Sequence, residues 1–317
     1  MLNQVSWHEV NVGVGWGTLR GKRCIIGDPH AIPTLQIIGL HGWLDNANTF
    51  DRLVPFLPCG IEVFVLDLPG HGFSDHLPKG AHYSFLPFVI NVRAVVLELG
   101  WKTFVFMSHS FGSLIASHYT ALYPEDVLAL ILLDYIKPFS IHEPKVTWHL
   151  EVNLILKTEH EKEPSPVYSK EEALQKIINS RKTGPKKNMH NIDEESAEVL
   201  LPRLTKQVDG GLTWIHDRKV RALFEMLSGN DKWIGILSTI KCPVLLIHAL
   251  EGVFIGPDSE YEDVLGTLSS NAQRFDYITL KGPHHIHLTN PSQVSPFVNS
   301  FLADVMSDVQ KNVISKL

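Results

Sequence analysis

The chain of 317 residues has few cysteines, no long apolar segment and no extended basic block. Cys24, Cys59 and Cys242 are too few for a disulfide scaffold and lack metal-ligand spacing, which favours a reducing compartment. The longest apolar run, Val127 to Leu133, is far shorter than the roughly 20 residues of a membrane helix, and the N-terminus lacks a signal-peptide pattern. A net charge of -6 indicates no nucleic-acid partner. We expect no membrane span, no metal and no cofactor.

The composition, with 44% hydrophobic and 20% charged residues, is that of a globular protein with a large core. Apolar strand candidates alternate with helical stretches, which is typical of a mostly parallel α/β sheet flanked by helices. The strand candidates are Leu35 to Leu40, Val63 to Leu66, Phe104 to Met107, Leu128 to Leu133, Val244 to Ile247 and Phe275 to Leu280. Two glycine-punctuated segments, Val5 to Val12 and Gly15 to Arg20, predict an antiparallel pair at the sheet edge.

The central part of the chain differs from its flanks because it is rich in charge and poor in apolar runs. We expect residues 138–230 to form an inserted helical cap. Residues 1–137 and 231–317 then form one α/β core, which is a common arrangement at this length.

Two cap helices have sequence signals. Ser169 and Glu172 form a capping box that predicts the start of a helix. A second helix is predicted over Glu194 to Leu201, ending before Pro202 because proline lacks the N–H that a helix interior needs.

The stretch Ser108 to Gly112, Ser-His-Ser-Phe-Gly, fits the G-x-S-x-G nucleophile elbow except at its first position. A strand candidate over Thr103 to Met107 precedes it and a helical stretch over Ser113 to Leu122 follows it, which is the context the motif requires. The turn is so tight that strand and helix approach closely, and small residues are needed beside the serine. The pattern indicates Ser110 as a nucleophile.

A serine hydroxyl needs a histidine base and a carboxylate that orients this base. The loop after the last predicted strand holds His284, His285 and His287. Asp134 directly follows one apolar strand and Glu251 lies on the loop after another, so both acids are expected at the carboxyl edge of the sheet. Asp134 is preferred, and Glu251 is the alternative acid.

Acyl transfer also needs hydrogen-bond donors for the developing oxyanion. The N–H of Phe111, next to Ser110, is one candidate, and the N–H of Trp43 in the turn His41 to Asn46 is the second. The glycine- and proline-rich segment Asp67 to Ser74 is interpreted as a structural turn.

The last three residues are Ser315-Lys316-Leu317, which match the C-terminal address read by the peroxisomal import receptor. They predict a peroxisomal location with that receptor as a partner. The alternatives are a coincidental ending and a cytoplasmic location.

Together, His41-Gly42-Trp43, Asp67 to Ser74, Ser108 to Gly112, Asp134 and the Gly282 to Pro291 histidine loop resemble the α/β-hydrolase fold family in order and spacing. Within it, the His-Gly-Trp-Leu-Asp-Asn turn and the Ser-Lys-Leu ending are most similar to serine hydrolase-like proteins.

The resemblance implies that His284, the first histidine of its loop, is the base. The family's usual acid follows the penultimate strand in a Gly-x-x-Asp pattern, whereas this chain has Ala249-Leu250-Glu251-Gly252. A dehalogenase-like branch instead has the acid after the strand before the cap, and Asp134-Tyr135-Ile136-Lys137-Pro138 resembles that arrangement. Dehalogenase chemistry itself is disfavoured, since it needs an aspartate in place of Ser110.

The sequence therefore predicts a serine hydrolase that cleaves a small-molecule ester or thioester. Two alternatives stay open. An acyl-CoA thioesterase or acyltransferase would need a basic cap groove, for which the candidates are Arg181, Lys182, Lys186 and Lys187. The other alternative is a non-catalytic hydrolase-fold binding protein. It is motivated by serine in place of glycine at position 108 and by the absence of the family's usual aspartate after the penultimate strand.

Overall fold

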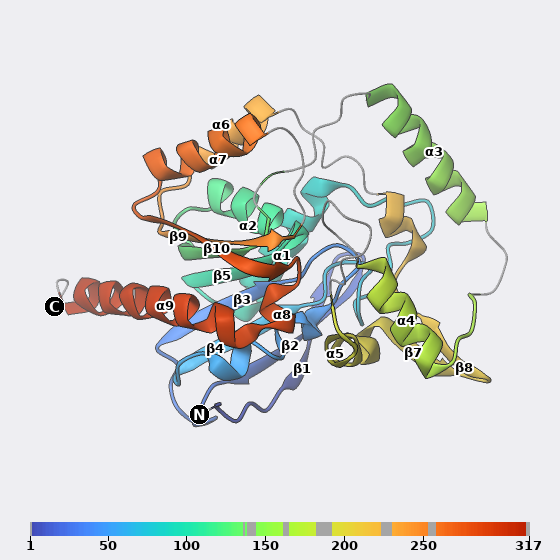
Figure 1. Cartoon of the computed structure of the whole chain (residues 1–317), viewed down its shortest axis with the longest axis horizontal. Helices are drawn as coiled ribbons and strands as arrows, with labels where there is room; N and C mark the ends of the chain where they lie inside the picture. Colours follow the sequence, from blue (N-terminus) through green and yellow to red (C-terminus); the bar gives the residue numbers. More distant parts are fainter. Residues whose placement is uncertain are drawn as a thin grey trace.

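The computed structural model describes residues 2–135, 137, 144–160, 165–181, 192–222, 230–252 and 258–314. Its centre is an eight-stranded sheet with the order β1-β2-β4-β3-β5-β6-β9-β10 (Figure 1). The β1–β2 and β2–β4 pairs are antiparallel, and the remaining pairs are parallel. The strands are β1 (His8–Val14), β2 (Gly17–Ile25), β3 (Leu35–Leu40), β4 (Ile61–Leu66), β5 (Phe104–His109), β6 (Val127–Leu133), β9 (Val244–Glu251) and β10 (Phe275–Pro283).

Side chains of the central strands alternate between two apolar layers, because successive residues of a strand point to opposite faces. On one face, Ile38 and Phe106 pack against α1 (Phe85–Leu99), α2 (Phe111–Leu122), α6 (Asn230–Leu237) and α7 (Asp258–Asn271). On the other, Ile37 and Val105 pack against α9 (Pro291–Ile314) and the short helices η1 (Ala47–Phe50) and η2 (Val54–Phe56). The predicted mostly parallel sheet flanked by helices is confirmed.

The segment between β6 and α6 contains both helices and a small sheet. Its elements are α3 (Pro144–His160), α4 (Lys170–Ser180), α5 (Glu194–Leu204), β7 (Thr205–Val208), β8 (Gly211–Trp214) and η3 (Arg218–Ala222). The β7–β8 hairpin turns through Asp209 and Gly210, the latter with φ +83°. Asp-Gly is a strong two-residue hairpin signal. The expectation of a helical cap did not include this hairpin.

The capping box of Ser169 and Glu172 is confirmed at the start of α4. The prediction that the next helix ends before Pro202 is wrong, because α5 continues to Leu204. Pro202 lies in the last turn, so it removes a single hydrogen bond near the helix end.

The cap packs directly on the loops that hold the candidate site. Its apolar cluster, which includes Ile177 and Leu200, also contains Leu288 of α8 (Ile286–Thr289), just after the histidine loop. A second attachment is ionic: Arg203 of α5 bonds to the buried carboxylate of Asp67, at 3.0 Å through Nε and 2.7 Å through Nη2. Cap and site loops are therefore parts of one packed assembly.

Some predicted features lie outside the described residues, namely Ser315-Lys316-Leu317 and the basic candidates Lys182, Lys186 and Lys187. The peroxisomal address stays a prediction. Within the described ranges, no helix has the length and apolar character to cross a bilayer.

Candidate functional site

Ser110 lies on a sharp turn between β5 and α2. Its φ of +51° and ψ of -118° are unusual for a residue with a side chain, and such strain is characteristic of a nucleophile elbow. A Cβ added at Gly112 would overlap the backbone carbonyl of Leu40. Glycine at this position therefore lets α2 approach the end of β3, and that approach holds Ser110 in its strained conformation.

The serine at position 108, where the motif has glycine, is fully buried. Its backbone carbonyl accepts a 3.0 Å hydrogen bond from the Ser113 hydroxyl, while its own Oγ has no partner among the described residues. Among the described non-glycine residues, positive φ occurs at Leu44, Ser110 and Asp134 and not at Ser108. Position 108 needs a small residue but no left-handed backbone, so serine fits.

His284 and Asp134 come together from loops 150 residues apart. Nδ1 of His284 lies 2.7 Å from Oδ2 of Asp134, which is fully buried. The other oxygen, Oδ1, accepts a 2.6 Å hydrogen bond from the N–H of Ala249 and lies 3.3 Å from Nδ1 of His248. Because both oxygens are engaged, the Asp134 carboxylate is fixed in orientation toward His284.

The alternative acid, Glu251, lies at the end of β9, where it pairs with Pro283 of β10. Its neighbour Gly252 borders the Asp134 carboxylate so closely that a Cβ there would overlap Oδ2. The two candidate acids therefore share one neighbourhood. Asp134 is hydrogen-bonded to His284.

The loop after β3 lies against the elbow. A Cβ at Gly42 would lie 3.2 Å from Cβ of Ser110 and 3.0 Å from Nδ1 of His109. The N–H of Trp43 belongs to this loop, and the N–H of Phe111 begins α2, where the first N–H groups have no acceptor within the helix. Trp43 is 42% exposed, and its Nε1 donates to the carbonyl of Val220, so it is not a core residue.

Two buried histidines, which the sequence analysis did not assign a role, brace this loop. Nε2 of His41 accepts from the N–H of Leu68, and Nε2 of His71 accepts from the N–H of Leu44. Each Nδ1 lies within 3.0 Å of a backbone carbonyl, to which it donates as the neutral tautomer. Burial lowers the pKa of both, for His41 despite the opposing charge of Asp67.

Because of these two histidines, we expect the protein to lose stability in mild acid. Their pKa values lie below that of an unfolded histidine, about 6.5, so the unfolded state binds more protons as the pH falls. The stability that these two histidines contribute is complete above about pH 6.5. Below that pH, the free energy of unfolding falls by about 1.4 kcal/mol per pH unit for each histidine. Urea unfolding between pH 7 and 5 measures this slope. His71→Asn should have a shallower slope, and an unchanged slope would contradict the assignment.

Arg181, a candidate for the basic groove of an acyl-CoA enzyme, is in a different environment. Its side chain is 11% exposed, donates 3.0 Å to the carbonyl of Leu44 and lies 3.6 Å from Oδ1 of Asp45. These contacts within the protein make Arg181 a weak candidate for a phosphate-binding groove.

Comparison with known proteins agrees with this geometry. Residues 37–291 match the family described as alpha/beta hydrolase fold. The chain belongs to the α/β-hydrolase family. A serine hydrolase-like protein from Danio rerio is 32% identical over 303 residues, which cover 93% of this chain and 88% of that protein. Serine hydrolase-like protein 2 from Homo sapiens is 31% identical over 93% of each chain.

Among solved structures, a hypothetical protein from Pseudomonas aeruginosa is 28% identical, with a TM-score of 0.78 over 93% of this chain and 99% of its own. The resemblance to α/β-hydrolases, and within them to serine hydrolase-like proteins, is confirmed. The family and these relatives support a hydrolase as the class of protein to which this chain belongs.

Proposed function

We propose that this α/β-hydrolase cleaves carboxylic esters or thioesters through an acyl-Ser110 intermediate. The observation that carries the proposal is the 2.7 Å contact between His284 and the buried Asp134, next to the strained serine elbow. The elbow and the histidine loop are in direct contact, since Nε2 of His109 lies 3.0 Å from the carbonyl oxygen of His284.

In this mechanism Ser110 Oγ attacks the carbonyl carbon of the substrate while His284 accepts the hydroxyl proton. The N–H groups of Phe111 and Trp43 stabilise the oxyanion. Asp134 holds the Nδ1–H tautomer of His284 and stabilises the imidazolium. Collapse of the intermediate expels the alcohol or thiol, which takes the proton from His284. His284 then activates a water that releases the carboxylic acid and regenerates Ser110.

The acyl-CoA alternative has less support, since Arg181 is engaged with Leu44 and Asp45. A non-catalytic binding protein stays the alternative from a different class. The ordinary backbone at Ser108 and the orientation of Asp134 toward His284 favour catalysis over it.

The proposal predicts that esters and thioesters with the same acyl group reach the same kcat when hydrolysis of the shared acyl-Ser110 limits turnover. Steady-state release of p-nitrophenol and of thiol from matched substrates measures this, with a pre-steady-state burst as the sign that deacylation is limiting. No turnover of either class over a range of acyl lengths would favour the binding protein.

A further inference from the structure

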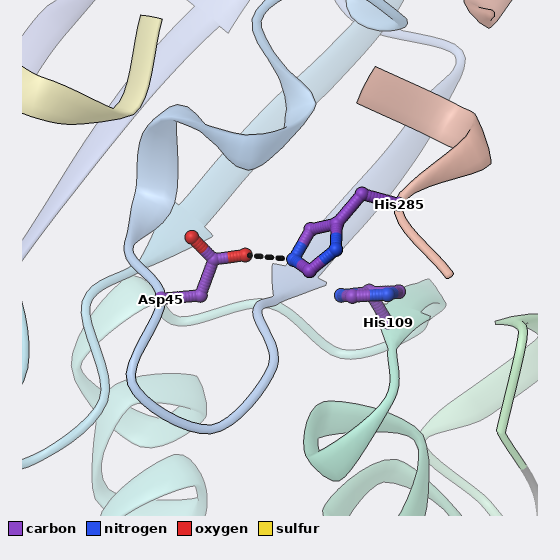
Figure 2. Close-up of side chains that lie close together, drawn as sticks. All are labelled: Asp45, His109 and His285. Atoms are coloured by element: carbon purple, nitrogen blue, oxygen red, sulfur yellow. Dashed lines mark ion pairs between the residues drawn. The ribbon is translucent and has the colours of Figure 1, made fainter. Parts of the chain in front are cut away.

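Next to the elbow lie three side chains of the types that bind metals, and the proposed hydrolysis uses none of them. They are Asp45 from the loop after β3, His109 from the end of β5 and His285 from the histidine loop (Figure 2). All three are buried, and one ligand atom from each lies within 4.8 Å of the others. Nε2 of His285 is 3.3 Å from Oδ2 of Asp45, a contact that is not aligned as a hydrogen bond.

His109 has one ring nitrogen without a hydrogen-bond partner among the described residues. Its Nε2 faces the carbonyl oxygen of His284 at 3.0 Å, and since a carbonyl can only accept, Nε2 carries the ring proton. Nδ1 is then an unprotonated, buried acceptor with no partner among the described residues. Histidine ligands of metals usually donate their other ring N–H in this way.

The remaining two groups also have buried polar atoms without a hydrogen-bond partner among the described residues. These atoms are both carboxylate oxygens of Asp45 and Nδ1 of His285. If His285 binds through Nε2, its ring proton is on Nδ1. The cluster therefore offers two imidazoles and one carboxylate, a set that suits zinc.

We propose that Asp45, His109 and His285 form a binding site for a divalent transition-metal ion, with Zn²⁺ as the representative ion. Zinc holds tetrahedral ligands at about 2.0–2.2 Å, so their atoms are roughly 3.4 Å apart. Binding thus draws the three side chains together. His109 precedes Ser110 and bonds to the carbonyl of His284. By moving His109, the ion displaces Ser110 and His284 and so inhibits the proposed hydrolase. This consequence rests on the proposed function.

Arg181 limits the affinity of this site. Its guanidinium lies 3.6 Å from Asp45 Oδ1 and repels a second cation at the same carboxylate. Removing this charge should tighten zinc binding, whereas removing a ligand should weaken it.

Equilibrium dialysis and the zinc-dependent shift in Tm test the proposal. Both use the full-length protein with Ser110→Ala, so that binding is measured without turnover. We expect Asp45→Asn, His109→Asn and His285→Asn each to weaken binding by at least the roughly 10- to 100-fold that loss of an outer-shell partner causes. Arg181→Gln should tighten it by about tenfold. His118→Gln on α2, outside the cluster, is the matched control and should bind as before.

Equal zinc binding by the ligand variants and the control would place the ion elsewhere on the chain and would overturn the site. Loss of binding in His284→Gln with retention in Asp45→Asn would place it on the proposed triad and also overturn it. X-ray absorption of the bound ion serves where a ligand variant fails to fold. Two imidazoles with oxygen are expected, and sulfur or oxygen-only coordination would contradict the proposal. Binding with no effect on hydrolysis would overturn only the inhibitory consequence.

Discussion

Asp134→Asn should lower kcat by about 10⁴-fold, because the amide can leave His284 in the wrong tautomer while hardly changing the shape of the site. The expected cause is local: Oδ2 of Asp134 is the atom that contacts Nδ1 of His284. The measurement is kcat and KM on the ester with the highest turnover, with Tm measured alongside to show that the variant folds.

Glu251→Gln is the matched control. Both acids lie at the same edge of the sheet, next to each other through Gly252, so a general disturbance of this edge would affect the two variants alike. We expect Glu251→Gln to retain most of the activity. A large loss from Glu251→Gln with little loss from Asp134→Asn would assign the acid to Glu251. Small effects from both would indicate that neither carboxylate serves a catalytic histidine.

Gly112→Ala should destabilise the fold by about 3 kcal/mol or more, because the added Cβ meets backbone that cannot move aside. The obstructing atoms are the carbonyl group of Leu40 and the carbonyl oxygen of His41, at the end of β3. The helix can relieve the overlap only by moving away from the strand, which also removes the geometry of Ser110. Urea unfolding gives the loss of stability, and the activity of the remaining folded protein reports on the elbow.

Gly266→Ala in α7 is the control for glycine replacement. Position 266 is exposed, and nothing lies within 4 Å of the added Cβ. Alanine is the better helix former, so this variant should gain about 0.5–1 kcal/mol. A similar response of the two variants would contradict the close approach of α2 to β3.

The sequence predicted the sheet well because its central strands are short, buried and apolar. The placement of Ser110, Asp134 and His284 at one edge was predictable for a related reason, since parallel strands bring the residues after their carboxyl ends together. Their catalytic roles stay a prediction. The β7–β8 hairpin was predictable too, from Asp209-Gly210, although the charged composition around it obscured the strands.

Other parts of the site could not be read from the sequence. The bond between Arg203 and Asp67 joins residues 136 positions apart, and nothing local to either marks the other as its partner. The same holds for Asp45 and His285, which meet only when the loops after β3 and β10 come together. The contacts of Arg181 with Leu44 and Asp45 were also unpredictable, since they join the cap to a loop 137 residues away.

The central claim is that Ser110 is an activated nucleophile, and a fluorophosphonate probe tests it most directly. The folded protein should gain one phosphonate, which peptide mass spectrometry locates on Ser110, and Ser110→Ala should gain none. Failure of the folded protein to react, or equal labelling of Ser110→Ala, would contradict the account.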